Sequence, residues 1–260
     1  MKTTLALIDK ANAEGADVYL DVYPYTASHT SLIANLVPAS LHPKGTVSAV
    51  SLLDDEEFCD MLKEQMYKSR GYDFSHVLVT AYKHNKEYEG KNLNEIAEIR
   101  GDTNPYETGL NLLRESGGVG SACTFSMNED DVRYVIAHPR AMICTDSSVK
   151  TKNDKYHPRL TASFTRAIAR YVRDLPTVSL TEMIRKMTSL PASVYKLDTK
   201  GVIRIGMDAD LCIFDADKIA DTADYVNCAS KNVGLNYVII AGKVVLTDNN
   251  YNGTRAAYAK

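Results

Sequence analysis

The sequence predicts an α/β fold followed by a small β-rich region, and three observations indicate this. A helical pattern ends at Gly15 and leads directly into alternating apolar and polar residues at 17–23, an order typical of parallel α/β units. A fully apolar strand is expected at 141–145, as inside a parallel sheet. After residue 200, runs rich in β-branched residues replace the helix–strand alternation.

A long stretch between the two predicted parallel strands follows a different pattern, and we expect an insertion over about residues 33–125. An amphipathic helix is predicted at 54–69 and a strand at 76–82. Two short helices follow. The first starts at a capping box, Asn92 with Glu95, and the second has Pro105 at its first helical position. The pair Gly117-Gly118 ends the second helix.

The α/β pattern then returns and gives way to β-structure. Asn128 is expected to cap a helix that precedes the strand at 141–145, and Ser179 to cap a later one. Two segments near the C-terminal end, GVIRIGMDADLCIFD and LNYVIIAGKVVLTD, are predicted as β-rich, with a hairpin turn at residues 241–243. The expected domains are 1–198, which contains the insertion, and 199–260.

Composition excludes several classes of partner. The net charge is −3 and no cluster of Lys and Arg forms a nucleic-acid patch. No apolar run approaches the roughly 20 residues that span a bilayer. Neither a nucleic acid nor a membrane is therefore expected as a partner. Five widely spaced cysteines, an odd number without a CxxC pair, favour a reducing compartment, most simply the cytoplasm.

Asp146 is the first candidate for chemistry, because it directly follows an apolar parallel strand. Sites in α/β proteins lie at the carboxyl ends of such strands, where a carboxylate can bind a metal or act as a general base. The alternative is a turn or cap residue. Arg159, near a helix start, could bind a substrate carboxylate, or could be an exposed loop arginine. Tyr23 could line a pocket or simply pack.

The histidines predict no complete metal site. They form no HxH or HExxH pattern and no pair at helical spacing, whereas a hydrolytic zinc site normally needs about three protein ligands. His138-Pro139-Arg140 repeats the tripeptide of residues 157–159 but precedes the buried strand, so we interpret it as structural.

Five segments in order resemble the C-terminal part of the D-aminoacylases, the N-acyl-D-amino-acid deacylases of the amidohydrolase superfamily. They are DVYPYTASHTSL, ICTDSSV, HPRLTASFTRAIARYVRD, LTEMIRKMTSLPASVYKL and GVIRIGMDADLCIFD. The resemblance implies a (β/α)8 metal-dependent-hydrolase barrel with a small β-sandwich, and zinc-dependent hydrolysis of the amide of N-acyl-D-amino acids. It also implies that Asp146 binds a proton or a metal, that Arg159 pairs with the substrate carboxylate, and that Tyr23 contacts substrate.

The chain departs from the family pattern in two ways. It has Ser28-His29-Thr30 where the family usually has Gly-Ser-Thr, so His29 occupies the position of a substrate-contacting serine. The HxH pair and the other zinc ligands of the family would fall before Met1. A complete barrel needs about 250 residues, whereas this chain shows about two barrel strands. We therefore expect a C-terminal portion, only part of the barrel, that is inactive without the N-terminal half.

Two alternatives stay open from the sequence. The missing ligands would also fit a catalytically inactive remnant or an assembly module. The segment GMDADLCIFD is shared among amidohydrolases, so a dipeptidase or a hydantoinase-like enzyme is the other alternative.

Overall fold

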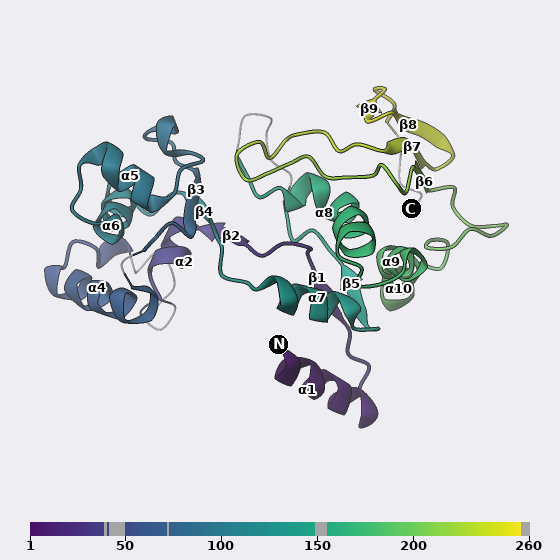
Figure 1. The fold of residues 1–260 in the computed structure, drawn as a ribbon, viewed down its shortest axis with the longest axis horizontal. Helices are drawn as coiled ribbons and strands as arrows, with labels where there is room; N and C mark the ends of the chain where they lie inside the picture. Colours follow the sequence, from purple (N-terminus) through teal and green to yellow (C-terminus); the bar gives the residue numbers. More distant parts are fainter. Residues whose placement is uncertain (39–40, 42–49, 72, 149–154, 256–260) are drawn as a thin grey trace.

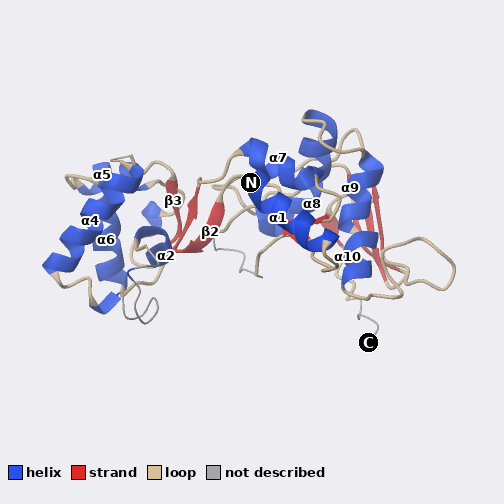
Figure 2. Cartoon of the chain, turned by 90° about the horizontal axis from the view of Figure 1, so that it is seen from below, coloured by secondary structure: helices blue, strands red, loops and turns tan. Residues whose placement is uncertain are grey.

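The computed structural model describes residues 1–38, 41, 50–71, 73–148 and 155–255, and the chain is a mixed α/β protein. Helices α4, α5 and α6 gather at one end of the molecule and the C-terminal sheet lies at the other (Figure 2). Between them lie two short parallel strands and the helices around them (Figure 1). Within the described residues, no helix is both long and apolar enough to cross a membrane.

The central pair consists of β1 (Leu20–Val22) and β5 (Ala141–Ile143), which run parallel with Leu20 opposite Ala141. Both strands are shorter than the ranges expected from the sequence, because the ladder covers only three residue pairs. Helices α1 (Lys2–Ala13) and α7 (Glu129–Ala137) contribute to a small core against them, centred on Leu5, Val135 and Ala141. The predicted Asn128 cap of α7 is confirmed.

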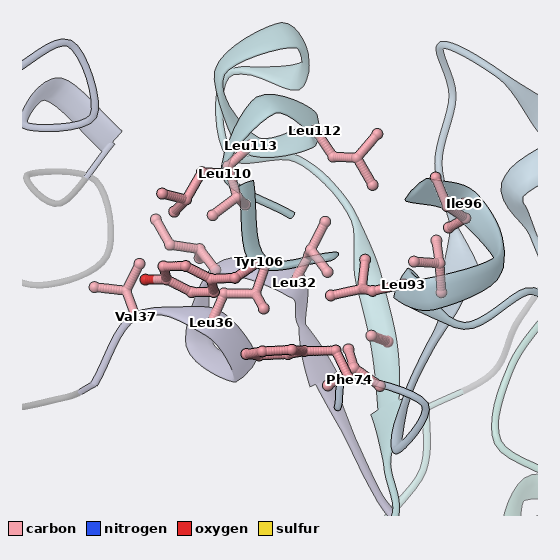
Figure 3. Close-up of a cluster of buried hydrophobic side chains, with 14 of the residues drawn as sticks. Leu32, Leu36, Val37, Phe74, Leu93, Ile96, Tyr106, Leu110, Leu112 and Leu113 are labelled. Atoms are coloured by element: carbon pink, nitrogen blue, oxygen red, sulfur yellow. The ribbon is translucent and has the colours of Figure 1, made fainter. Parts of the chain in front are cut away.

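Residues 28–124 contain a three-stranded antiparallel sheet in the order β2-β4-β3 with helices beside it. Its core draws only on residues 32–122, including Phe74, Tyr106 and Leu112 (Figure 3). The capping box at Asn92 and the proline at the start of the second short helix are confirmed. The elements are β2 (Ser28–Ser31), α2 (Leu32–Leu36), α4 (Glu56–Arg70), β3 (Val77–Ala81), η2 (Lys86–Tyr88), α5 (Leu93–Arg100), α6 (Pro105–Ser116) and β4 (Ser121–Thr124).

After β5 the chain forms a helical layer. Helix α8 (Arg159–Ile168) continues into the π-helix η3 (Ala169–Asp174), and α9 (Leu180–Met187) and α10 (Ser189–Val194) follow. Ser179 caps α9 as expected, since its side chain accepts the amide hydrogen of Glu182. A core of residues from α7, β5, α8, η3 and α9 joins this layer to the central strands.

The C-terminal sheet is antiparallel, in the order β6-β7-β8-β9. Its strands are β6 (Leu211–Phe214), β7 (Leu235–Ile240), β8 (Lys243–Thr247) and β9 (Asn250–Tyr251). The hairpin turn is confirmed, because Ile240 pairs with Lys243 across Ala241-Gly242 and both turn residues have positive φ.

One expectation for this region was wrong. Residues 201–210 were expected to be β-rich, but the strand begins only at Leu211. Gly201 and Gly206 lie at φ 85° and 90°, values that break a strand, and Ile203 and Ile205 between them are fully exposed. The apolar alternation there does not correspond to a buried face.

Lys186 on α9 anchors the start of β5 and yields a stability prediction. Its ammonium group is fully buried, donates to the carbonyl oxygens of His138 and Ala141, and lies 3.5 Å from Glu182. Lys186→Met should lower the free energy of unfolding by about 1–3 kcal/mol, since it removes the buried donor to the Ala141 carbonyl oxygen, whereas the His138 carbonyl oxygen still accepts the Ala141 amide hydrogen. Urea unfolding measures this. Lys10→Met is the control, because Lys10 makes the same i,i+4 type of pair with Glu14 in solvent. Equal losses for both variants would contradict the anchoring role.

Candidate active site at the end of β5

Asp146 is turned out of the strand direction just after β5. The Cys144 amide still donates to the Val22 carbonyl, at 3.0 Å, so the parallel pairing reaches Cys144. Asp146 then adopts φ 46°, a left-handed conformation that aspartate tolerates better than most residues. Its carboxylate Oδ2 lies 2.8 Å from Nη2 of Arg159. The strand end and the start of α8 therefore meet at an ion pair.

Arg159 is buried, with 4% of its surface exposed, so it is not the exposed loop arginine that the sequence left possible. Its guanidinium lies over the ring of Tyr23, with the carbon Cζ 4.4 Å from the ring centroid. Nη2 pairs with Asp146, whereas Nε and Nη1 are buried and find no acceptor among the described residues. Each such unpaired donor costs about 1–3 kcal/mol. The structure thus holds a cation with unused hydrogen-bonding capacity.

His157 orients the backbone at the start of α8. Nε2 lies 2.8 Å from the Ala27 carbonyl oxygen and must donate to it, while Nδ1 accepts the Arg159 amide hydrogen at 3.0 Å. This pattern requires the neutral ring with its proton on Nε2. Burial lowers the pKa of His157 from 6.5 to about 3, which agrees with that state. The histidine is therefore a neutral support for Arg159.

The other His-Pro-Arg tripeptide has the same local geometry at the opposite end of β5. Nδ1 of His138 accepts the Arg140 amide hydrogen at 3.3 Å. Arg140 lies over the ring of Tyr19 at 4.7 Å and pairs with Asp17 at 2.9 Å. His138 itself contacts Asp9, at 2.9 Å, on α1. These contacts fasten α1 and the loop before β1 to the start of β5, and they agree with a structural role.

His29 approaches the site from a different sheet. It lies on β2, where Nε2 is 2.9 Å from the Thr80 hydroxyl, which is in turn 2.9 Å from that of Ser121. His29 lines a cavity of about 810 Å³ together with Asp146 and Arg159. Tyr23 lines a neighbouring cavity of about 740 Å³, to which Asp146 also belongs. The four residues proposed from the sequence thus line these two adjoining cavities.

Burial shapes the acid–base properties of the tyrosine and the thiol nearby. The pKa of Tyr23 is raised by burial, and the positive charge of Arg159 partly opposes that rise. Burial and the charge of Asp21 raise the pKa of the Cys144 thiol to about 12. Both groups are therefore protonated at neutral pH, so Tyr23 can donate a hydrogen bond and Cys144 is no nucleophile.

A metal site is not complete within the described part of the chain. No group of three or more His, Cys, Asp or Glu side chains there is arranged to hold a metal ion. Asp146 is a carboxylate at a strand end, 64% exposed, and can offer one oxygen ligand. The described residues alone do not fit a zinc centre.

Sequence reasoning missed two contributors to this arrangement. His157 was considered only as part of a tripeptide. The repetition of His-Pro-Arg at 138–140 could have indicated a shared local contact, in which Nδ1 of the histidine accepts the amide hydrogen of the arginine. Tyr225 carried no signal. Its ring lies 5.0 Å from that of His157, yet it is 68 residues away in sequence (225 − 157).

The buried neutral His157 predicts how stability depends on pH. Its pKa of about 3 in the folded chain lies below the unfolded value of 6.5, so the unfolded chain binds the extra proton. The stabilisation is complete above pH 6.5 and is lost as pH falls toward 3, by up to about 1.4 kcal/mol per pH unit. Urea unfolding measures the free energy of unfolding at each pH between 6.5 and 4. For His157→Asn this free energy should change less steeply with pH than it does for the wild type. His84→Asn, at an exposed site, should keep the slope of the wild type, and an unchanged slope for His157→Asn would contradict the assignment.

Comparison with known proteins identifies the domain that carries this site. Residues 130–246, which include Asp146 and Arg159, match the model of the amidohydrolase family. These residues form an amidohydrolase-family domain. The amidohydrolase match begins at α7 and ends within β8.

The relatives of the whole chain are deacylases of N-acyl-D-amino acids. The chain is 32% identical to the N-acyl-D-glutamate deacylase of Alcaligenes xylosoxydans xylosoxydans over 93% of its own length and 41% of that protein. It is 29% identical to the D-aminoacylase of the same organism, over 98% and 44%. The chain therefore spans less than half the length of these curated relatives.

Solved structures agree with this relationship. The N-acyl-D-glutamate deacylase of Bordetella bronchiseptica, complexed with zinc and a phosphonate mimic of the tetrahedral intermediate, aligns with a TM-score of 0.71 and 29% identity. The match covers 94% of this chain and 43% of that one. A crystal structure of D-aminoacylase aligns with a TM-score of 0.73 and 31% identity, over 97% and 44%. Another solved structure of D-aminoacylase concerns the functional role of its binuclear metal centre.

Proposed function

We propose that this chain supplies the substrate-carboxylate and proton-transfer side of an amidohydrolase site that hydrolyses N-acyl-D-amino acids. The observation that carries the proposal is the Asp146–Arg159 pair at the carboxyl end of a parallel strand, in which two guanidinium nitrogens have no acceptor among the described residues. The relatives named above act on such substrates, which supports the choice of substrate class.

Arg159 is the proposed ligand for the substrate carboxylate. Guanidinium groups bind carboxylates through paired hydrogen bonds, and here three contacts hold Arg159, two at its guanidinium and one at its backbone amide. The Tyr23 ring supports its face, Asp146 binds Nη2, and His157 fixes the backbone amide. A carboxylate entering the cavity would supply acceptors for Nε and Nη1 and would recover the cost of burying them unpaired.

Asp146 is the proposed proton acceptor, and Tyr23 a hydrogen-bond donor to substrate. A carboxylate can take the proton of the attacking water and later deliver it to the leaving nitrogen. Because the Tyr23 hydroxyl is protonated, it can donate to the amide oxygen on which negative charge develops. His29, which lines the same cavity as Asp146 and Arg159, is the proposed contact for the substrate side chain.

Zinc is the cofactor of the related N-acyl-D-glutamate deacylase structure, and in such sites it polarises the carbonyl and activates water. In this chain Asp146 would be one ligand. The remaining ligands would come from protein that this chain does not contain.

The same proposal covers the architecture. We take residues 1–198 as part of a (β/α)8 barrel with the insertion at about 33–125, and 199–260 as one sheet of a β-sandwich. Two features support this view. The core of the proposed insertion is separate from the other cores, and Ile213 and Tyr237, which pair across β6 and β7 on one face of the C-terminal sheet, are both exposed. An N-terminal half-barrel would cover such surfaces. The five free thiols support a cytoplasmic location.

The test supplies the part of a D-aminoacylase that this chain does not match, as a separate polypeptide co-expressed with it. N-acetyl-D-methionine and N-acetyl-D-glutamate are the substrates, N-acetyl-L-methionine is the stereochemical control, and zinc is present throughout. We expect turnover of the D-substrates by the assembled pair and none by the isolated chain. Robust turnover by the isolated chain would contradict the dependence on a second half. A folded, zinc-loaded pair without turnover would favour the assembly module.

A further inference from the structure

A segment of the C-terminal sheet reaches back onto the proposed active site. Residues 220–233 lie between β6 and β7, and Ala220 pairs with Val233 as a bridge that closes the segment at its base. From there the loop extends over α8, in yellow-green in Figure 1. We call residues 220–233 the strap.

The strap is fastened on both sides of His157. Ahead of it in sequence, Lys155 donates to the Val226 carbonyl at 2.9 Å. Beyond it, Arg166 on α8 pairs with Asp221 at 2.9 Å. Further bonds join Thr161 to the carbonyl of Cys228, Thr165 to Asn232, and Asn232 to the carbonyl of Thr161. Because contacts flank the histidine along the chain, the strap has a defined position over it.

The strap places one aromatic ring against His157. The centroid of Tyr225 lies 5.0 Å from that of His157, with the planes at 76°, and 4.6 Å from that of Phe125. Tyr25 meets the histidine at 4.9 Å and 90°, and Tyr23 at 6.0 Å. The imidazole is therefore enclosed by three tyrosine rings, and Tyr225 is the one that the strap contributes.

We propose that Tyr225 is a positioning residue for Arg159. Its ring holds the His157 imidazole in the orientation in which Nδ1 accepts the Arg159 amide hydrogen, and so keeps the guanidinium over Tyr23. The strap between β6 and β7 thereby takes part in forming the proposed carboxylate site. This inference deepens the proposed function and rests on the carboxylate role of Arg159.

The experiment compares Tyr225→Leu and Tyr225→Phe with Tyr237→Leu, which removes an exposed tyrosine ring from β7, the strand that follows the strap. Nitrogen-15 NMR shifts of His157 report its tautomer, and the Arg159 Nε–H resonance reports the order of the guanidinium. Calorimetry with N-acetyl-D-methionine reports binding. Tyr225→Leu should mix the tautomers, move the Arg159 resonance and weaken binding about tenfold. Tyr225→Phe should restore all three readouts, and Tyr237→Leu should match the wild type.

Several results would overturn the inference. Wild-type His157 and Arg159 signals in Tyr225→Leu would do so, as would the same changes in Tyr237→Leu. A tautomer change without any shift of the Arg159 resonance would refute the link between the two residues. If the wild-type chain binds no N-acetyl-D-methionine, the carboxylate role fails, but the two NMR readouts still decide the role of Tyr225. Should Tyr225→Leu not fold, as seen by circular dichroism, Tyr225→Met is measured in the same way.

Discussion

Asp146→Asn should lower kcat of the assembled deacylase by about 10²- to 10⁴-fold, the usual contribution of a positioned general base. Asparagine has the same shape and also tolerates the left-handed backbone at φ 46°, so the fold should survive. The amide cannot accept a proton at neutral pH, and it replaces the charged partner of Arg159 with a neutral one. The measurement is the initial rate with N-acetyl-D-methionine at saturating substrate.

Asp248→Asn provides the matched control. Asp248 lies in the turn between β8 and β9 and has the same φ of 46°, but it lines neither of the two cavities beside Asp146. We expect no change in rate for this variant. An unchanged kcat for Asp146→Asn would exclude Asp146 from proton transfer and would favour the turn-residue interpretation.

Arg159→Met should raise KM by about 10²- to 10³-fold, because loss of one partner from a buried charged hydrogen bond costs about 2–5 kcal/mol. Methionine keeps an unbranched stem in the buried channel but removes every donor. The effect should fall mainly on KM, with a smaller change in kcat, since the carboxylate of the substrate is paired in both the ground state and the transition state. Full kinetics with N-acetyl-D-methionine separate the two parameters.

Arg140→Met is the control for this change. Arg140 belongs to the other His-Pro-Arg tripeptide, lies over a tyrosine ring and pairs with an aspartate, as Arg159 does. It stands at the opposite end of β5, so its loss should affect stability and leave KM unchanged. A KM effect of equal size in both variants would show that the arginines act through the fold, and would remove Arg159 from substrate binding.

Local signals in the sequence predicted most of the helix boundaries. Asn92, Asn128 and Ser179 cap the helices that they were expected to cap, because a cap depends on side chains within three residues of the helix start. The prediction that residues 201–210 are β-rich was wrong because it depended on long-range burial and not on local contacts. Alternating apolar residues predict a strand only when one face of it is buried. In the described part of the chain, Ile203 and Ile205 are exposed.

The residues around the site were predictable to different degrees. Asp146 follows from its place after an apolar strand, and Arg159 and Tyr23 came from ordered motifs. Their mutual contact, with the guanidinium over the ring and on the carboxylate, depends on the packing of α8 against the two parallel strands. No spacing rule predicts the approach of His29 from β2, or of Tyr225 from the strap, because each arrives through long-range contacts.

The sequence by itself determined the mixed α/β class, the capped helices, the hairpin at Ala241-Gly242 and the candidates Asp146, Arg159 and Tyr23, since these rest on local propensity and on motif order. Only the tertiary structure decided that Arg159 is buried with unpaired donors and that His157 is neutral. The same holds for the contact between His157 and Tyr225 of the strap. Burial and desolvation depend on the whole packed chain, and they give the second His-Pro-Arg tripeptide the buried arginine that we propose binds a carboxylate.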